Sequence, residues 1–248
     1  MSTAARAANL APHRRRVLVT GGTSGIGLAI AQAFAARGDE VHATGATEPE
    51  VAEAQTAAGD IAFVQLDVRQ DAAVSTFVAS LGELDTVVNC AGAIRRGGVE
   101  FDPQTFADTV DINLNGTMRV CAAARAGLKT RVGCIINTAS MLSFFGGGLV
   151  PGYSASKGGV AQLTKSLAIA YAVDGIRVNA VAPGWIETPL TQALRDDPAR
   201  SAPIVARTPL GRWGTPADVA GPVLFLASEA AAFVTGIILP VDGGYLVA

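Results

Sequence analysis

Short runs of β-branched residues alternate with longer Ala- and Leu-rich amphipathic stretches along almost the whole chain. The strand-like runs are 17–20, 41–44, 61–66, 86–89, 133–137, 177–181 and 237–240. The helix-like stretches are 25–37, 49–58, 72–81, 106–128, 153–173 and 216–227. Parallel strands need long crossover connections, and helices supply right-handed crossovers that cover both faces of a sheet. We therefore predict an α/β fold, a doubly wound parallel sheet of about seven strands with helices on both faces.

Length and charge bound the kind of protein further. The chain has 248 residues, 50% of them hydrophobic, and a formal net charge of −2. This length suits a single domain, which we expect over 14–248, after an N-terminal tail over 1–13 that we expect to be disordered. The charge balance offers no basic field for nucleic acid, and no uninterrupted apolar run is long enough for a membrane helix.

The few cysteines and histidines argue against a metal site or a hydrolase. Cys90, Cys121 and Cys134 are odd in number and far apart, so they form neither a zinc spacing nor a disulfide framework. Reduced thiols in apolar segments suit a cytoplasmic protein. His13 and His42 are too few for a His-rich metal site, and no G-x-S-x-G pattern marks a serine nucleophile.

A glycine-rich turn, T-G-G-T-S-G-I-G at 20–27, follows the first predicted strand and opens the first predicted helix. Its glycines allow the backbone to approach a pyrophosphate, and the helix N-terminus offers unpaired N–H groups. No G-K-[ST] follows, so the turn is not a phosphate-hydrolysing P-loop. We predict a dinucleotide-binding Rossmann fold. The turn residues expected at the cofactor are Gly21, Thr23, Ser24, Gly25, Ile26 and Gly27.

Two later strand ends offer further cofactor contacts. Asp67 and Val68 end the third predicted strand, where a carboxylate can accept a hydrogen bond from an adenine amino group. Capping of the next helix is an equally good role for Asp67. Asn89, Ala91 and Gly92 end the fourth strand, and small residues there let a cofactor lie across the carboxyl ends of the strands.

Tyr153 and Lys157 stand four residues apart in Y-S-A-S-K, at the start of a predicted helix. This spacing places both side chains on one helix face, one turn apart. An ammonium beside a phenol favours the phenolate, so we expect Lys157 to lower the pKa of Tyr153 from its usual value of about 10. A tyrosine tuned in this way can transfer a proton to or from an alcohol oxygen near neutral pH.

In this order, the motifs resemble those of the short-chain dehydrogenase/reductase family, along nearly the whole chain after about residue 14. The matches are T-G-G-T-S-G-I-G at 20–27, Asp67-Val68, N-C-A-G at 89–92, D-I-N-L-N-G at 111–116, N-T-A-S at 137–140, Y-S-A-S-K at 153–157 and P-G-W-I-E-T at 183–188. Cys90 replaces the second Asn of the commoner N-N-A-G.

The resemblance implies a role for each matched residue. Tyr153 would be the general acid/base on the substrate oxygen, and Lys157 would lower its pKa and hold the nicotinamide ribose. Ser140 would orient the substrate oxygen, and Asn113 would support a proton relay behind Lys157. The residues that would close over the cofactor are Pro183, Gly184, Ile186 and Thr188.

The implied activity is an NAD(P)-dependent oxidoreductase that interconverts a secondary alcohol and a ketone. A non-catalytic nucleotide-binding sensor on the same fold is the alternative of another class, and it predicts a degraded set of catalytic residues. An epimerase or dehydratase of the extended relatives would need a larger C-terminal domain. The resemblance also implies a homotetramer paired through the helices near 106–128 and 153–173.

The choice between NAD and NADP depends on the end of the second strand. NAD-dependent relatives carry an Asp where this chain has Gly45, and Ser24 replaces the basic residue that many NADP-dependent relatives carry in the glycine turn. A 2′-phosphate normally needs Arg or Lys, so their absence favours NAD. Thr44 and Thr47 leave phosphate binding by hydrogen bonds open.

The substrate pocket should include the Pro-containing segment 184–215, which we predict to be a mobile lid. The expected apolar wall is Met141, Leu142, Phe144, Phe145, Trp185, Leu190 and Trp213, with a subunit contact as the alternative for the two phenylalanines. The substrate contacts we single out are Arg95, Met141 and Trp185.

Arg95 and Arg96 follow the N-C-A-G motif, and this tract resembles that of sugar-acid dehydrogenases of the family. A pair of guanidinium groups can hold a carboxylate; a solvated loop or a subunit contact is the alternative role, and the sequence alone favours it slightly. We expect a small polyol or sugar acid as substrate, with a 3-oxoacyl thioester as the alternative.

Overall fold

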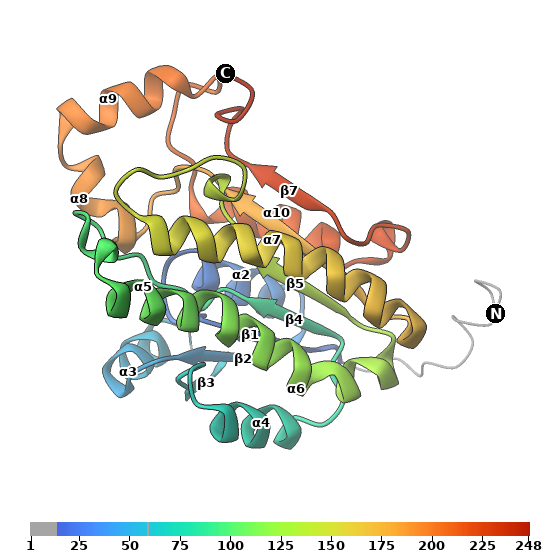
Figure 1. The fold of residues 1–248 in the computed structure, drawn as a ribbon. Helices are drawn as coiled ribbons and strands as arrows, with labels where there is room; N and C mark the ends of the chain where they lie inside the picture. Colours follow the sequence, from blue (N-terminus) through green and yellow to red (C-terminus); the bar gives the residue numbers. More distant parts are fainter. Residues whose placement is uncertain (1–13, 59) are drawn as a thin grey trace.

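The computed structural model describes residues 14–58 and 60–248, so the tail predicted over 1–13 lies outside the described residues. Seven parallel strands form one sheet in the order β3-β2-β1-β4-β5-β6-β7 (Figure 1). The strands are β1 Arg16–Thr20, β2 Glu40–Gly45, β3 Ala62–Gln65, β4 Thr86–Asn89, β5 Cys134–Thr138, β6 Arg177–Pro183 and β7 Ile238–Val241. All seven were predicted, and the doubly wound α/β fold is confirmed.

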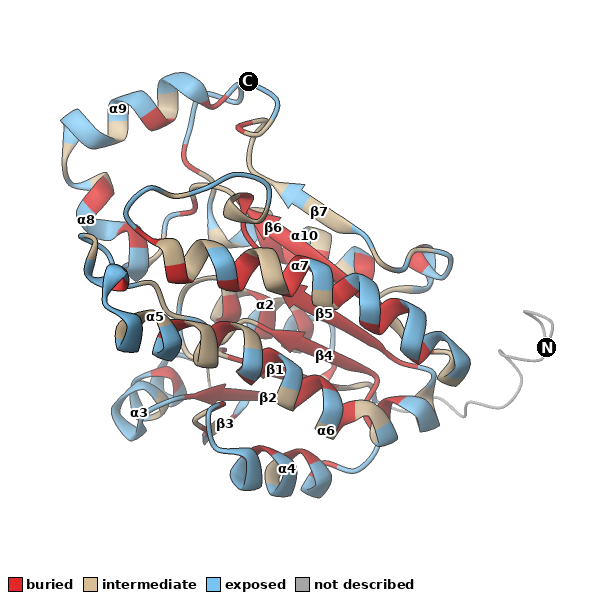
Figure 2. Ribbon diagram, in the orientation of Figure 1, coloured by how far each residue is buried: buried red, intermediate tan, exposed pale blue. Residues whose placement is uncertain are grey.

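Helices cover both faces of this sheet. They are α2 Gly25–Ala36, α3 Glu48–Ala57, α4 Asp71–Ser80, α5 Pro103–Val110, α6 Gly116–Arg131, α7 Pro151–Tyr171, α8 Gln192–Arg195, α9 Pro198–Arg207 and α10 Pro216–Leu226. One core layer joins the sheet to α2, α3 and α10, and the other joins it to α4, α6 and α7. Figure 2 shows the buried strands enclosed by helices whose outer faces are exposed.

Strand β1 shows how a single strand serves both layers. Val17 and Val19 pack into the layer that contains Ile30 of α2, whereas Leu18 packs into the layer that contains Val120 of α6. All three strand residues are fully buried. Successive side chains of a strand point to opposite faces, so a strand buried on both faces needs a continuous apolar run.

Two segments differ from the prediction. The helix expected over 106–128 is divided by a π-helical turn, η2 Asp111–Asn115, that joins α5 to α6. The segment 184–215 also contains η5 Pro189–Thr191, α8 and α9. Helix α9 begins with a proline behind an aspartate cap, as the Asp197 side chain accepts from the Ala199 N–H.

The sheet reverses its strand order between β1 and β4. In open α/β sheets the crevice at the carboxyl ends of the strands beside such a reversal is the usual ligand site. None of the described helices is long and apolar enough to cross a membrane.

Candidate active site

A cleft of about 880 Å³ opens at the carboxyl ends of the central strands and brings most of the predicted site residues together. Those that line it are Gly21, Thr23, Ser24, Gly25, Ile26, Gly27, Asp67, Val68, Ala91, Gly92, Arg95, Ser140, Met141, Tyr153, Lys157, Pro183, Gly184, Trp185, Ile186 and Thr188. Asn89 and Asn113 do not line it.

The glycine turn forms the floor at one end of the cleft. Gly21 has a positive φ of 62°, and a Cβ there would lie 2.6 Å from the Ala91 Cα. A Cβ at Gly27 would lie 2.1 Å from the Gly21 carbonyl oxygen. Side chains are therefore excluded from this turn. Helix α2 begins behind it without a side-chain cap from Ser24, so its first N–H groups face the cleft.

Lys157 is almost completely buried, and its Nζ donates to the Thr138 carbonyl oxygen at 2.6 Å. The Nζ lies 5.7 Å from the centre of the Tyr153 ring. Burial lowers the pKa of Lys157 from 10.5 to about 8. A Cβ at Gly92 would lie 3.6 Å from Nζ, so the glycine leaves the ammonium group open to the cleft.

The expected depression of the Tyr153 pKa is wrong for the protein alone. Desolvation of the phenol raises the pKa of Tyr153 above 10, outweighing a hydrogen bond with Ser140 and the charge of Arg96, which both lower it. The groups that lower this pKa are Ser140 and Arg96, while the Lys157 ammonium group lies on the same helix face, 5.7 Å from the centre of the ring. Desolvation therefore exceeds charge stabilisation at this oxygen.

Ser140 lies at the start of a short 3-10 helix, η3 Met141–Ser143, that packs against α7. Its Oγ accepts from the Leu142 N–H at 3.1 Å, and the Ser143 Oγ donates to the Lys157 carbonyl oxygen at 2.7 Å. These bonds fix the Ser140 hydroxyl relative to the helix that carries Tyr153.

Asn113 lies behind the cleft in the π-turn and is fully buried. Its side-chain amide bonds both backbone groups of Ala93, at 2.7 and 2.9 Å, and donates to the Ser156 Oγ at 2.9 Å. The amide thus joins the end of β4 to α7. Single π-turns are frequent at functional sites, and this one directs the Asn113 side chain inward.

Asn89 was predicted to contact the cofactor, but its side chain is buried beneath the cleft. Its Nδ2 donates to the Asn137 Oδ1 at 2.9 Å and to the Cys121 Sγ at 3.3 Å. It joins β4 to β5 and α6. The neighbouring strands supply polar partners for the buried amide, Asn137 on β5 and Thr20 on β1.

Guanidinium groups gather at the end of the cleft beside Tyr153. Arg95, Arg96 and Arg200 all line it, and Arg200 comes from α9. Charge interactions couple Arg96 to both Tyr153 and Arg200, and partial desolvation lowers the pKa of Arg96. In the described part of the chain, the Arg96 and Arg200 guanidinium groups have no hydrogen bond or ion pair.

The apolar wall is formed by only part of the predicted set. Met141, Leu142, Phe145, Trp185 and Leu190 line the cleft, but Phe144 and Trp213 do not. Phe144 is 52% exposed.

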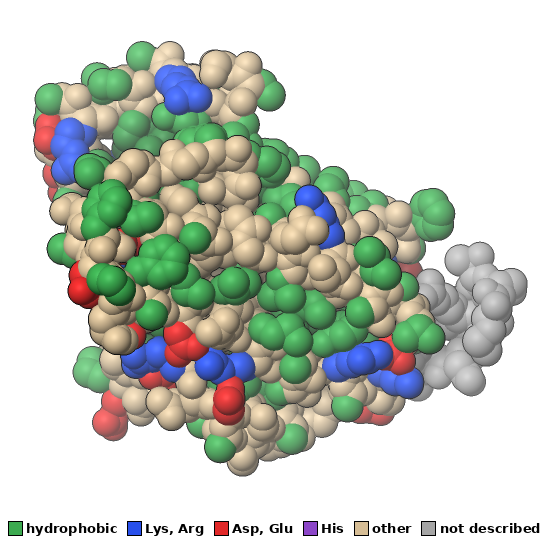
Figure 3. Space-filling view, viewed as in Figure 1, with side chains coloured by type: hydrophobic (Ala, Val, Ile, Leu, Met, Phe, Trp, Pro, Cys, Tyr) green, Lys and Arg blue, Asp and Glu red, His purple; other side chains and the backbone are tan. Residues whose placement is uncertain are grey.

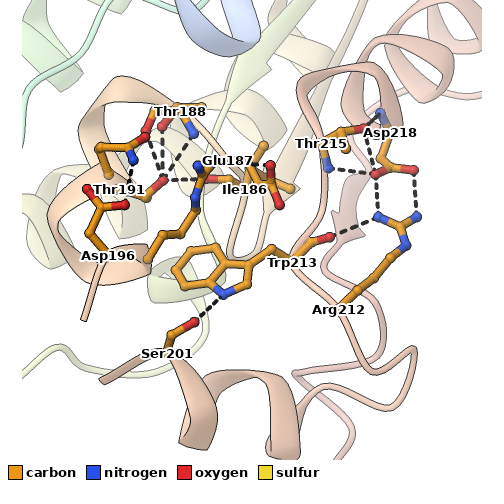
Figure 4. A network of polar contacts seen from close by, with 12 residues as sticks. Ile186, Glu187, Thr188, Thr191, Asp196, Ser201, Arg212, Trp213, Thr215 and Asp218 are labelled. Carbon is orange, nitrogen blue, oxygen red and sulfur yellow. Dashed lines mark hydrogen bonds and ion pairs between the residues drawn. The ribbon is translucent and has the colours of Figure 1, made fainter. Parts of the chain in front are cut away.

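Trp213 is instead part of a small core inside the lid with Leu194 and Ile204. Its ring lies edge-on to that of Trp185, with the ring centroids 5.6 Å apart. Its Nε1 donates to the Ser201 Oγ at 2.9 Å (Figure 4). It therefore supports the cleft from behind.

The two ends of the lid are tied to each other and to α10. Glu187 N–H donates to the Gly214 carbonyl oxygen at 2.8 Å, and Gly214 N–H donates to the Trp185 carbonyl oxygen at 2.9 Å. Arg212 forms a two-point ion pair with Asp218 in the first turn of α10, at 2.8 and 2.9 Å. Figure 4 shows the Arg212–Asp218 ion pair to one side of Trp213. These contacts hold the two ends of the segment 184–215 together and against α10.

At the opposite end, Asp67 is held by Arg69. The Arg69 guanidinium group contacts both carboxylate oxygens, at 2.6 to 3.0 Å, and its hydrogen bonds lower the pKa of Asp67. Asp67 does not cap α4, whose N-cap is Gln70. Thr44 and Thr47, weighed above as phosphate contacts, do not line the cleft.

Glu50 and Arg200 are among the cleft residues that were not predicted from the sequence. Glu50 follows β2 and is the last residue of a T-x-x-E capping box, a pattern that was available in the sequence. Arg200 lies on a helix that was not predicted, and no local pattern places it beside Arg96.

Glu100 is a further unpredicted residue, fully buried behind the Arg95–Arg96 segment. Its carboxylate accepts from the Arg95 N–H and from the Tyr153 N–H, both at 2.8 Å. It therefore joins the segment that carries the guanidinium groups to the first turn of α7.

We expect Glu100→Gln to lower the free energy of unfolding by about 1–3 kcal/mol, because the amide NH₂ would face a buried N–H donor. Urea unfolding measures this change. Glu187→Gln is the control, since Glu187 pairs with Arg195 on the surface and such pairs contribute about 0–1 kcal/mol. Equal changes in the free energy of unfolding for the two substitutions would show that the Glu100 hydrogen bonds do not stabilise the fold.

Comparison with known proteins agrees with this geometry. A family model described as enoyl-(acyl carrier protein) reductase matches residues 21–246. The chain is 42% identical over 241 residues to 2-dehydro-3-deoxy-D-gluconate 5-dehydrogenase of Bacillus subtilis, covering 94% of each chain. It belongs to the short-chain dehydrogenase/reductase family.

Two further relatives frame the choice of substrate. A solved gluconate 5-dehydrogenase from Burkholderia cenocepacia, in complex with NADP and tartrate, superposes with a TM-score of 0.86 at 36% identity and covers 94% of this chain and 96% of that one. A 3-oxoacyl-[acyl-carrier-protein] reductase from Chlamydia muridarum is 35% identical, over 93% of this chain and 96% of the relative. Like these relatives, the chain is an NAD(P)-dependent dehydrogenase that acts on CH–OH groups.

Proposed function

We propose that the chain oxidises a secondary hydroxyl of a small sugar acid or related hydroxy acid, or reduces the matching ketone, with NAD as its preferred cofactor. The observation that carries the substrate class is the pair of unpaired guanidinium groups of Arg96 and Arg200 beside Tyr153. The 2-dehydro-3-deoxy-D-gluconate 5-dehydrogenase relative supports the same class of substrate.

The cleft fits a dinucleotide along its whole length. The turn at 21–27 excludes side chains, the first turn of α2 offers free N–H groups, and Gly92 leaves Lys157 accessible. The other expected contacts are Asp67, Val68, Ala91, Pro183, Gly184, Ile186 and Thr188, which all line the cleft. When bound, the nicotinamide accepts a hydride from the alcohol carbon or supplies one to the ketone carbon.

Tyr153 holds the proton that balances the hydride. In the reducing direction its hydroxyl donates to the substrate oxygen, and in the oxidising direction its phenolate removes the hydroxyl proton. Ser140 orients the same oxygen through its fixed hydroxyl group. Lys157 stabilises the phenolate by its positive charge. Asn113 holds the backbone at Ala93 in a fixed position relative to the first turns of α7.

Arg96 and Arg200 are proposed to bind the substrate carboxylate. Neither guanidinium group has an anionic partner in the described part of the chain, and repulsion between them would be relieved by an anion. Arg95 is the less favoured contact, because no charge interaction couples it to Tyr153. Met141 and Trp185 would contact the carbon skeleton, and the Trp185 Nε1 is a buried donor without a partner among the described residues.

The segment 184–215 is proposed to act as the lid of a single domain that spans 14–248. This segment carries Arg200, so its closure over the cleft would bring the Arg200 guanidinium group, in addition to that of Arg96, to the carboxylate of a bound substrate. Its closed ends at Trp185–Gly214 and Arg212–Asp218 would serve as fixed points for that motion.

We also propose a cytoplasmic homotetramer. Ile169 and Val173 are 81% and 84% exposed at the end of α7 and just beyond it, and Met118 of α6 is 38% exposed. Figure 3 shows hydrophobic side chains over the face formed by α5, α6 and α7. Burial of such a face between subunits would be favourable. Sedimentation velocity measures the assembly, and the three free cysteines suit a reducing compartment.

We expect Arg96→Ala to raise the KM for the acid substrate about 10- to 100-fold with a small change in kcat, because a charge-assisted hydrogen bond contributes about 1.5–3 kcal/mol. The neutral polyol of the same length should show no such change. Steady-state rates with aldonic acids, their keto forms and matched polyols measure this. Lys165→Ala, which removes one exposed charge of α7, is the control.

The same panel tests the alternative, reduction of a 3-oxoacyl thioester. Turnover of a 3-oxoacyl thioester with no turnover of any acid would replace the sugar-acid proposal. An unchanged KM for acids in Arg96→Ala and in the Arg96→Ala, Arg200→Ala double variant would remove the carboxylate argument. Absence of hydride transfer with every substrate would favour the nucleotide-binding sensor.

A further inference from the structure

The turn between β2 and α3 carries a carboxylate where the family resemblance places a cofactor-selecting residue. The Glu50 Oε2 accepts from the Ala46 N–H at 2.9 Å and from the Thr47 N–H at 3.2 Å. The Thr47 Oγ1 accepts in return from the Glu50 N–H, which completes a capping box. Glu50 lines the cleft together with Gly45 and Ala46, at the end remote from Tyr153.

A side chain at Gly45 would have to displace the side chain of Thr23. A Cβ at this position would lie 2.7 Å from the Thr23 Cγ2 and 3.3 Å from the Glu50 Oε2. The Glu50 carboxylate therefore occupies the space next to Gly45 into which an Asp side chain at the end of β2 would extend. The negative charge is provided by the first turn of the following helix instead of by the strand.

The same carboxylate occupies the groups that a phosphate would use. Backbone N–H groups at the start of a helix can form an anion site, and here the N–H groups of Ala46 and Thr47, in the turn just before α3, are already bonded to Glu50. The hydroxyl of Thr47 is engaged with the Glu50 N–H, and the Thr44 Oγ1 is buried outside the cleft.

Cations at this end of the cleft are also engaged. Among the described residues that line it, Arg69 is the basic side chain near this turn, and Asp67 binds it through both oxygens. A 2′-phosphate carries a charge of about −1.5 to −2, so next to Glu50 it would meet repulsion without a free counter-ion. A ribose 2′-hydroxyl would instead find an acceptor in the carboxylate.

We propose that Glu50 is the specificity-determining residue that lets this site accept NAD(H) and reject NADP(H). The inference rests on the proposed function, because it assumes that the adenosine half of the cofactor lies against the β2–α3 turn. The structure of the Burkholderia cenocepacia relative contains NADP, so the proposal predicts for this chain a preference for the other nicotinamide cofactor.

The experiment is equilibrium binding of NADH and NADPH to the whole protein, followed by energy transfer from tryptophan to the reduced nicotinamide. Titration calorimetry with 5′-AMP and 2′,5′-ADP isolates the adenosine half. Both are performed at low ionic strength, because Glu50 is exposed to solvent and salt screens its charge.

The wild-type protein is expected to bind NADH at least about 30-fold more tightly than NADPH. Glu50→Gln removes the charge but keeps an oxygen acceptor for the turn, so we expect NADPH affinity to rise about 10-fold and NADH affinity to fall less than about 5-fold. Glu50→Ala, which frees both N–H groups, should favour NADPH at least as strongly. Glu48→Gln is the matched control, because Glu48 lies in the same helix turn, is exposed and does not line the cleft.

The outcomes separate this inference from the proposed function. Binding of neither nucleotide would overturn the proposed function. A wild-type preference for NADPH would overturn the Glu50 inference and the choice of NAD, but not the dehydrogenase activity. A wild-type preference for NADH that survives in Glu50→Gln and Glu50→Ala, or that Glu48→Gln weakens equally, would overturn the Glu50 inference alone.

Discussion

Tyr153→Phe is expected to lower the rate of hydride transfer by about 10³-fold or more, because general acid–base catalysis contributes about 10²–10⁴. The substitution removes one oxygen atom and keeps the ring that packs against the cleft. Cofactor affinity and the free energy of unfolding should therefore change little. Single-turnover absorbance of the reduced nicotinamide, with saturating cofactor and substrate, measures the chemical step directly.

Tyr171→Phe is the control for this substitution. Tyr171 lies on the same helix, α7, is buried in the core layer beside Arg125 and lies outside the cleft. Its loss of a hydroxyl group should leave the rate of hydride transfer unchanged. A Tyr153→Phe variant that retains more than about a tenth of the wild-type rate would assign proton transfer to another group.

The pH dependence follows from the direction of the Tyr153 pKa. Desolvation raises this pKa above 10 in the free enzyme, so the phenol is protonated at neutral pH and ready to donate to a ketone. Oxidation of an alcohol needs the phenolate, and its kcat/KM should rise with pH over the neutral and alkaline range. The rise should be absent in Tyr153→Phe.

The architecture and most of the cleft could be predicted from the sequence because they depend on local patterns. The strands are four to seven residues long, and the central strands β1, β4, β5 and β6 are mostly buried. A glycine-rich turn between a strand and a helix directs the N–H groups of the helix N-terminus toward the carboxyl edge of the sheet, where a pyrophosphate binds. The turn at 20–27 was therefore predictable residue by residue.

The remaining features depend on contacts between distant segments. The π-turn at Asp111–Asn115 lies within a continuous helical pattern, and only its bonds to Ala93 and Ser156 explain why the extra residue is accommodated. Arg96 and Arg200 are 104 positions apart by number and meet only because α9 folds over the cleft.

The pKa of Tyr153 was predicted with the wrong sign for a related reason. The spacing of Tyr153 and Lys157 gives their shared helix face but not the depth at which that face is buried. Burial acts on both groups, raising the pKa of Tyr153 and lowering that of Lys157. A sequence pattern shows which charges are neighbours, whereas desolvation depends on everything packed around them.

Lys157→Met is expected to abolish most of the activity and, at neutral pH, to remove a cost in stability that the wild-type protein carries. The Lys157 side chain is 4% exposed, and burial lowers its pKa from 10.5 to about 8. Protonation of this amine in the folded protein at pH 7 therefore costs about 3 kcal/mol relative to the unfolded chain. Methionine has a similar length and no charge, so the variant does not carry this cost.

The pH dependence of the unfolding free energy tests the contribution of the Lys157 charge separately from the pH-independent effects of the substitution. The unfolded chain binds more protons at Lys157 than the folded protein between pH 8 and 10.5, so the wild-type gains stability from this group as pH rises through that window. Loss of the bond to the Thr138 carbonyl oxygen lowers the stability of the variant by a pH-independent amount. The difference in unfolding free energy between the two proteins should therefore shift by about 2 kcal/mol in favour of the wild-type between pH 7 and 9.5.

Urea unfolding of both proteins at the two pH values measures this shift, with Lys165→Met as the control for loss of an exposed lysine of α7. A pH-independent difference would show that Lys157 is not destabilised as a cation. A buried ammonium group that lowers stability is expected where its charge has a function, and the function proposed here is to favour the Tyr153 phenolate and to bind the cofactor. Lys157→Met should therefore lower the rate of hydride transfer by about 10²-fold or more at neutral pH, where it also removes the stability cost of the buried ammonium group.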